Sequence, residues 1–143
     1  VNWKDLDFII VDMPPGTGDT QLTFSQDIKM DGAIIVSTPQ EVALLDVKRG
    51  IKMFDKLGVK ILGLVDNMSF FIGDDGKKYQ IFGEGGVKKT AEEFQKEFLG
   101  EIPINSEIGK AGDRGKPIVE ANPEHEISKI YLDFASKIKS TYL

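Results

Sequence analysis

The sequence predicts an α/β fold in which a mainly parallel sheet is covered by helices on both faces, giving three layers. Two observations support this prediction. Short, continuous apolar runs recur along the chain, as in strands that are buried on both faces. Amphipathic helical patterns fill the gaps between these runs, and such alternation is typical of open parallel sheets with right-handed crossovers. With 143 residues the chain is long enough for a hydrophobic core, and we expect residues 1–143 to form a single domain.

The predicted strands are the apolar runs themselves. They are Phe8–Val11, Ala33–Val36, Ile61–Val65 and, with a weaker pattern, Phe98–Ile102. Because these runs are continuous rather than alternating, they indicate strands with helices on both sides.

One helix is predicted before the second strand and another after it. A short helix is expected from about Thr20 to Met30, with Asp19 as its cap. The longer helix after the second strand has apolar residues at three- and four-residue steps, and Gly58 supplies its stop. Its apolar stripe consists of Leu44, Val47, Ile51, Phe54 and Leu57.

Two further helices are predicted in the second half of the chain. The last begins at Pro123, which suits the first helical position, with Asn122 as its cap. Residues 68–86, before the first of these helices, and residues 105–122, before the last, form long predicted loops, which are often functional when ordered. The helix before the fourth strand repeats the apolar spacing at Val87, Ala91, Phe94 and Phe98.

Composition and charge exclude several classes of protein. The formal net charge is −5, so no general attraction to nucleic acid or to an anionic membrane is expected. No window approaches the apolar length of a transmembrane helix. The chain has no cysteine and can form neither a disulfide nor a thiolate metal site. Together with a start unlike a signal peptide, these features favour a cytoplasmic protein, with an organelle interior as the alternative, and predict no nucleic-acid or membrane partner.

The first apolar run ends in a carboxylate that a stiff, small turn follows, in IIVDMPPGTGD. In sheets of this kind ligands bind beyond the carboxyl ends of the strands, where Asp12 is expected. A carboxylate there can hold Mg²⁺ or its waters, and Gly16 allows a backbone N–H to approach a phosphate. An apolar strand, an aspartate and a glycine four residues later form the arrangement that senses a γ-phosphate in P-loop NTPases. The alternative is an aspartate that merely caps a turn.

The longer segment DMPPGTGDTQLTFSQ resembles the Mrp/ApbC family, the branch of ParA/MinD-like deviant P-loop ATPases that includes NUBPL. Later segments are similar to the same family in order and spacing, so that the resemblance covers essentially the whole chain. These segments are STPQEVALLDVKRGIKMF, ILGLVDNMSFF, IFGEGG, FLGEIPI and AGDRGKPIVEANP.

This resemblance implies an ATP-binding homodimer that carries iron–sulfur clusters to apo iron–sulfur proteins. It implies catalytic roles for Asp12, as the Walker B carboxylate that holds Mg²⁺ through water, and for Gly16, whose N–H would bind the γ-phosphate. It also implies that Asn67 hydrogen-bonds adenine and that Pro103 borders the base. An amide suits adenine because it has a donor and an acceptor, although a turn-forming asparagine is the alternative.

The sequence departs from the family in lacking its Gly-rich Walker A loop. Gly83–Thr90, GEGGVKKT, imitates that loop but has Lys88 where a glycine is required, so we interpret it as a glycine turn that leads into a helix. We therefore expect the chain to be the C-terminal portion of a P-loop NTPase domain, with the switch II and adenine-side half and little or no ATP hydrolysis by itself. Such a portion should leave apolar surface uncovered at Phe8, Ile10, Ile34 and Ile61.

A second departure concerns the cluster ligands. The family's CxxC positions fall on Gly73 and Gly76, which cannot bind iron, so cluster binding by this chain is doubtful. The segment GDDGKK is interpreted as a hairpin turn, with a hard-cation site at its aspartates as the alternative. Arg114 and Lys116 lie in a predicted loop that is either solvent-exposed or close to a nucleotide or partner.

Three functions are compatible with these patterns. The first is an ATPase-type iron–sulfur cluster carrier. The second is a catalytically silent binding or scaffold module, because the phosphate loop and the cysteines are missing. The third is a ParA/MinD-type partitioning ATPase. The PPGTGD turn and the spacing of NMS and IFG favour the first over the third.

Overall fold

The structure, a computed structural model, describes residues 2–13 and 18–142. Within these ranges the elements in chain order are α1 (Asp19–Asp27), β1 (Ala33–Ser37), α2 (Glu41–Leu57), β2 (Ile61–Asn67), β3 (Phe71–Ile72), β4 (Lys78–Tyr79), α3 (Gly86–Glu93), β5 (Phe98–Ile102), α4 (Ser106–Asp113), α5 (Ile118–Ala121) and α6 (Glu126–Tyr142).

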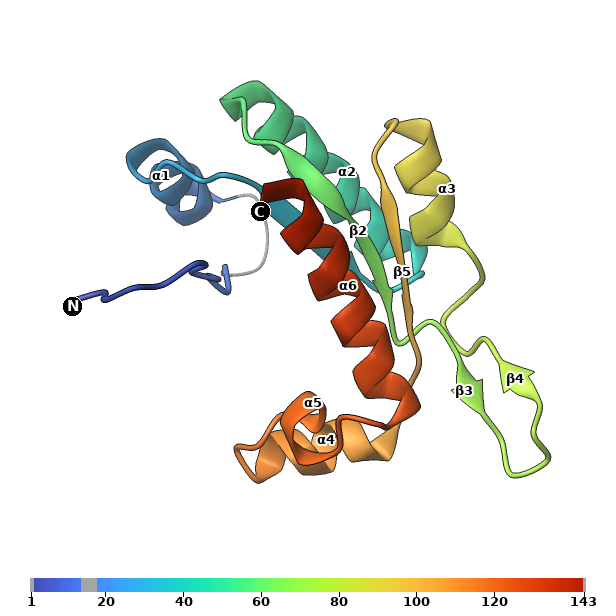
Figure 1. The fold of residues 1–143 in the computed structure, drawn as a ribbon. Coiled ribbons are helices and arrows are strands. Elements are labelled where there is room, and N and C mark those ends of the chain that lie inside the picture. The colour runs from blue at the N-terminus through green and yellow to red at the C-terminus, as the bar shows by residue number, and fades with distance from the viewer. Residues whose placement is uncertain (1, 14–17, 143) are drawn as a thin grey trace.

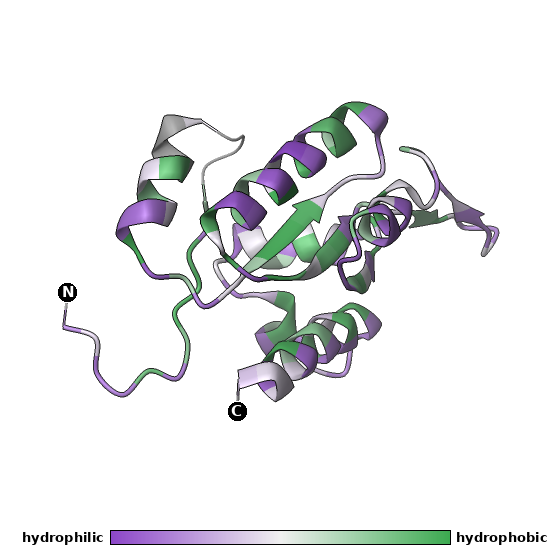
Figure 2. Ribbon diagram, turned by 90° about the horizontal axis from the view of Figure 1, so that it is seen from above, coloured by the Kyte–Doolittle hydropathy of each residue, from purple (hydrophilic) through white to green (hydrophobic). Residues whose placement is uncertain are grey.

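The described strands form one parallel sheet and one small hairpin. The sheet has the strand order β1-β2-β5, and the antiparallel pair β3-β4 projects beyond its carboxyl end (Figure 1). Seen from above, the apolar strands lie between α2 on one side and α6 on the other (Figure 2). The predicted three-layer α/β architecture is therefore confirmed.

Each face of the sheet has its own core. On one face, Ile51 of α2 and Val87 of α3 pack against Leu64 of β2, and all three are fully buried. On the other face, Phe134 of α6 packs with residues of β2 and β5, including Leu99. Burying one such side chain contributes about 1.5–3 kcal/mol, so these contacts hold the helices on the sheet.

The predicted end of the long helix is confirmed. Gly58 has a left-handed backbone with φ of +70°, and its N–H donates to the carbonyl of Asp55 at 3.2 Å. A residue without a Cβ adopts this conformation with little strain, which explains why α2 ends there.

The first apolar run does not form the predicted strand. Residues 2–13 lie as an irregular trace that stands off the sheet in both views (Figures 1 and 2), and Phe8 is 42% exposed and Ile10 93% exposed. A strand is stabilised by neighbours that pair with it, and in the described part of the chain β1 pairs only with β2. The expected uncovered surface is thus found at Phe8, Ile10 and Ile34, but the expectation for Ile61 was wrong because α2 and α3 bury it.

The first helix is close to its predicted position. It spans Asp19–Asp27, and the N-cap residue is Gly18 rather than the predicted Asp19. The helix ends three residues before Met30, because Ile28 already has an extended backbone.

The predicted loop over residues 105–122 contains two helices, which is a correction. The side chain of Asn105 caps α4 by accepting the N–H of Glu107 at 2.8 Å. Ala111 of α4 and Ile118 of α5 then pack against Ile127 of α6. Periodicity did not reveal these helices because α4 has only 8 residues and α5 only 4.

The last helix starts later than predicted. It begins at Glu126 rather than at Pro123, after a turn in which the N–H of His125 donates to the carbonyl of Asn122 at 3.1 Å. The ring nitrogen Nδ1 of His125 then accepts the N–H of Ile127 at 3.2 Å and so satisfies a free donor of the first turn. Among the described residues, none of the helices is long and apolar enough to cross a membrane.

Candidate functional site

The parallel strands end together at one rim of the sheet. Ser37 of β1 lies opposite Asp66 of β2, and Asp66 in turn lies opposite Glu101 of β5. Asn67 ends β2, and Pro103 follows β5 directly. In open α/β sheets this carboxyl rim is the usual place for a ligand, so these residues form the candidate site.

The structure brings together the segments of the two residues predicted to contact adenine. The N–H of Ser69 donates to the carbonyl of Ile102 at 3.1 Å, and the N–H of Ile104 donates to the carbonyl of Phe70 at 2.7 Å. The Ser69 hydroxyl also donates to the Ile102 carbonyl at 3.2 Å. These bonds join the chain just after Asn67 to the chain on either side of Pro103.

Asn67 is half-buried, and its side chain has a defined orientation. Its Oδ1 accepts the N–H of Met68 at 3.0 Å, and Met68 has a left-handed backbone with φ of +53°. This bond leaves the amide Nδ2 as the donor of the side chain, and Oδ1 retains a second lone pair. Asn67 thus combines the predicted turn role with an amide donor at the rim, for which the described part of the chain shows no hydrogen-bond acceptor.

Asp66 is a candidate residue that sequence reasoning missed. It is 1% exposed, and its Oδ1 has no hydrogen-bond partner among the described residues. The pKa of Asp66 is raised to about 6, mainly by burial; repulsion from Glu101 adds to this rise, and the charge of Lys78 of the hairpin opposes it. Lys78 lies 3.3 Å from the carboxylate of Glu101 and 3.9 Å from the centre of the Phe70 ring.

The signal for Asp66 was present in the sequence. ILGLVD is an apolar run that ends in aspartate, the same pattern that singled out IIVD around Asp12. A strongly shifted pKa in a carboxylate at the ligand rim is characteristic of functional sites.

Asp12 does not occupy the position that the sequence predicts for it. It is exposed, lies outside any strand, and belongs to the segment that stands off the sheet. Its donor type suits Mg²⁺, because hard cations bind carboxylate oxygens, but the described geometry does not bring it to the rim. Gly16, the other predicted catalytic residue, lies outside the described residues.

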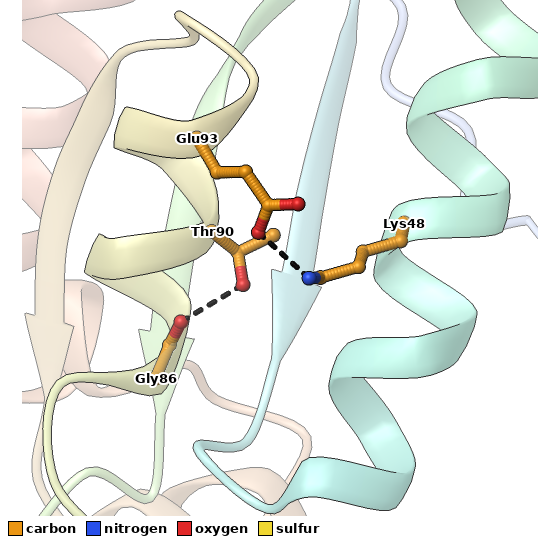
Figure 3. Close-up of polar contacts among 4 residues, drawn as sticks. All are labelled: Lys48, Gly86, Thr90 and Glu93. Carbon is orange, nitrogen blue, oxygen red and sulfur yellow. Dashed lines mark hydrogen bonds and ion pairs between the residues drawn. The ribbon is translucent and has the colours of Figure 1, made fainter.

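The segment GEGGVKKT forms a turn that leads into α3, which confirms the interpretation from the sequence. Thr90 is 3% exposed, and its hydroxyl donates to the carbonyl of Gly86 at 2.9 Å within α3 (Figure 3). A Cβ at Gly86 would lie 2.8 Å from the carbonyl oxygen of Pro39, so the glycine allows close packing rather than phosphate binding. In the same view Lys48 of α2 pairs with Glu93 of α3 at 2.7 Å.

The β3-β4 hairpin confirms the turn interpretation of GDDGKK. The N–H of Gly73 donates to the carbonyl of Lys77 at 2.9 Å, and Asp75 accepts the N–H of Lys77 and the hydroxyl of Tyr79. These bonds, with the Lys77 N–H foremost, lower the pKa of Asp75. In the ranges 2–13 and 18–142 no group of three His, Asp or Glu side chains is arranged to hold a metal ion.

Comparison with known proteins identifies a family. A family model described as "ParA: NUBPL iron-transfer P-loop NTPase" matches residues 1–139. An iron-sulfur cluster carrier protein of Synechocystis sp. is 49% identical over 140 residues, which are 96% of this chain and 40% of that relative. The iron-sulfur cluster transfer protein NUBPL of Mus musculus is 47% identical over 139 residues, 96% of this chain and 44% of that relative. The chain therefore spans about two fifths of the length of these curated relatives.

Solved structures show the same fold. A nucleotide-binding protein of Archaeoglobus fulgidus in complex with ADP has a TM-score of 0.71 and 42% identity, over 80% of this chain and 47% of that one. The cell division ATPase MinD of Pyrococcus furiosus has a TM-score of 0.70 at 23% identity, over 94% of this chain and 52% of that one. At that identity the second likeness concerns the fold alone.

Proposed function

The chain belongs to the ParA family, in the group described as NUBPL iron-transfer P-loop NTPase, and we propose that it is the adenine-side part of an ATP-binding iron–sulfur cluster carrier. The observation that supports this most directly is that the chain after β2 is hydrogen-bonded to the chain after β5 at the carboxyl rim of the sheet. Hydrogen bonds between Ser69 and Ile102 and between Ile104 and Phe70 hold Asn67 and Pro103 on one surface. The relative from Archaeoglobus fulgidus, 42% identical, is in complex with ADP, which favours a nucleotide at this rim.

Asn67 is the residue that would recognise the base. Its Nδ2 donates and its Oδ1 accepts, which matches the adjacent acceptor and donor of adenine. The Met68 N–H already holds Oδ1 in place, so little side-chain freedom is lost when the base binds. Pro103 is buried directly after β5 and supplies a rigid apolar neighbour.

We expect Asn67→Asp to weaken ADP binding about tenfold, because the variant keeps the acceptor for the Met68 N–H but loses the amide donor. The protein for this test is a fusion of this chain with the part of the Synechocystis relative that the chain does not cover. Isothermal titration with ADP measures the dissociation constant. Gln26→Glu, an equivalent change at an exposed position of α1, is the control. Unchanged affinity in Asn67→Asp would reduce Asn67 to a turn residue.

Asp12 is proposed as the carboxylate that holds Mg²⁺ through water. In the same fusion, Asp12→Asn is expected to lower ATP turnover about 100-fold while changing ADP affinity little, because the amide lacks the charge that the metal requires. Phosphate release under saturating ATP measures the turnover, with Asp5→Asn in the same segment as the control. Full turnover in Asp12→Asn would remove this role.

The cluster is cargo, and this chain supplies no thiolate for it, because it contains no cysteine. Gly73 and Gly76 stand at the positions that the resemblance implies for the family's cysteines, and polar groups of the hairpin bond to one another. We therefore propose that any cluster ligands come from other parts of the protein or from its apo-protein partners. A fusion that binds ADP but neither hydrolyses ATP nor carries a cluster would instead support the silent binding module.

Self-association and location belong to the same proposal. Exposed apolar side chains on the hairpin, including Phe71, Ile72 and Tyr79, favour contact with a second copy or with an apo iron–sulfur protein. We propose a homodimer that works in the cytoplasm, although an Arabidopsis thaliana relative is named as mitochondrial.

A further inference from the structure

A cavity of about 240 Å³ lies between α4, α5 and the turn that precedes α6. Asp12, Asn67 and Pro103 are not among its lining residues. Its apolar part includes the buried side chains of Ala111 and Ile118. The volume is slightly below that of pockets for drug-sized ligands, so the cavity suits a small molecule.

The cavity is positively charged in a chain whose net charge is −5. Lys110, Arg114 and Lys116 line it, against the single carboxylate of Glu107. Glu107, Lys110 and Arg114 follow each other at three- and four-residue steps, so they share one face of α4 and its C-cap. Glu107 pairs with Lys110 at 2.8 Å, and Lys116 is 3.9 Å from Glu120.

Arg114 is the cation with the most freedom to bind a ligand. Among the residues that the structure describes, it has no carboxylate within ion-pair distance. A guanidinium presents its donors in a planar fork that matches carboxylate and phosphate oxygens.

The pKa of Glu107 reflects the positive electrostatic potential in this cavity. A hydrogen bond from Lys110 and the charge of Lys110 lower the pKa of Glu107, and the charges of Arg114 and His125 lower it further. Groups from α4, from its C-cap and from the turn before α6 therefore act on the same carboxylate.

Buried hydrogen bonds fix the walls of the cavity. Ser128 is fully buried, and its hydroxyl lies 3.1 Å from the carbonyl oxygen of Ile118 and 2.6 Å from that of Asn122. On the other side the N–H of Lys116 donates to the carbonyl of Ala111 at 3.1 Å. These contacts hold α5 and the turn against α4 and α6, so the charges face a cavity with a defined backbone.

His125 adds a donor to this wall. Because its Nδ1 accepts the N–H of Ile127, a neutral His125 has its proton on Nε2. His125 thus lines the cavity with Nε2 as its donor, together with the amide of Asn122.

We propose that this cavity binds a small oxyanion with several carboxylate or phosphate oxygens, with Arg114 and Lys116 as its main ligands. Their charges and the apolar wall suit a compact, multiply charged molecule, and the positive residues outnumber Glu107. Asn67 and Pro103 do not line this cavity, so it would bind a second small molecule besides the nucleotide of the proposed function.

Isothermal titration of the full chain with citrate and, separately, with pyrophosphate at low ionic strength tests this proposal. We expect binding of at least one probe, and the stronger one identifies carboxylate or phosphate as the preferred chemistry. Arg114→Gln and Lys116→Gln should each weaken that binding about tenfold. Arg49→Gln is the matched control, because Arg49 is an exposed arginine that pairs with Asp46 on α2.

Each outcome decides the proposal. A tenfold loss in the Arg114 and Lys116 variants with unchanged affinity in Arg49→Gln supports it. No binding of either probe at millimolar concentration overturns it, as does an equal loss in all three variants, which would reflect only the general charge of the chain. Circular dichroism of each variant confirms that the helices are retained, and Lys116→Gln keeps the test decisive if Arg114→Gln disturbs the end of α4.

Discussion

Replacing Asp66 by asparagine is expected to raise the free energy of unfolding at pH 7 by up to about 3 kcal/mol. The pKa of Asp66 rises from its ordinary value of 3.8 to about 6, mainly because burial disfavours the charged form. A shift of about two units corresponds to about 3 kcal/mol, and an uncharged amide of the same shape avoids that cost.

The pH dependence gives the sign of this effect. Below about pH 4 Asp66 is protonated in both the folded and the unfolded chain, so its contribution to stability is fully present. As the pH rises through about 6 that contribution is lost, because the unfolded chain releases the proton more readily. The free energy of unfolding of Asp66→Asn should therefore change less with pH than that of the wild type between about pH 4 and 6.

Urea unfolding at a series of pH values measures the free energy of unfolding at pH 7 and its dependence on pH. Asp113→Asn, an exposed aspartate of α4, is the control and should change stability little. A loss of stability in Asp66→Asn at pH 7 would mean that the carboxylate has a favourable partner, and the burial argument would fail. A gain would show that the protein keeps a charge at the rim at a cost in stability, which is a common feature of functional sites.

Phe134→Ala is expected to lower the free energy of unfolding by about 3–5 kcal/mol. Phe134 is 9% exposed and joins Val65, Leu99 and Ile102 in the core under α6. Its ring lies over Gly100, where a Cβ would be only 2.9 Å from a ring carbon and where φ is +146°. The sheet thus leaves room for one aromatic ring, and its loss creates a cavity that the backbone cannot fill.

Leu132→Ala on the same helix is the control for this prediction. Leu132 is 51% exposed, so its truncation should cost far less. Chemical unfolding of both variants tests the difference. Equal costs would show that Phe134 is not a core residue and that α6 is held by other contacts.

The sequence predicted well the elements whose stabilising contacts follow local patterns. The runs at Ala33, Ile61 and Phe98 became β1, β2 and β5, and the stripe from Leu44 to Leu57 became α2 with its stop at Gly58. The α4 and α5 helices were missed because four or eight residues give too little periodicity. They form because Asn105 caps one and Ile118 packs against the last helix.

Some residues of the candidate site were likewise predicted from the sequence, and others were not. Asn67 and Pro103 were assigned from a family resemblance, and the described structure brings their segments together, while their contact with adenine stays a prediction. Asp12 and Gly16 also stay predictions, the first because its segment stands off the sheet and the second because it lies outside the described residues. Asp66 was not predicted, although its run ILGLVD repeats the pattern that singled out Asp12, because its burial beside Glu101 and Lys78 is visible only in the folded chain.

By itself the sequence determined the layer architecture, the positions of the paired strands, the long amphipathic helix and the absence of thiolate ligands. Only the tertiary structure decided that Phe8–Val11 is not a strand, that Asp66 is buried, and that four basic or imidazole side chains line one cavity. The reason is physical: helical periodicity and apolar runs are local properties of the chain. Strand pairing, the desolvation of a carboxylate and the convergence of charges depend on residues that are distant in sequence and meet only in the folded protein.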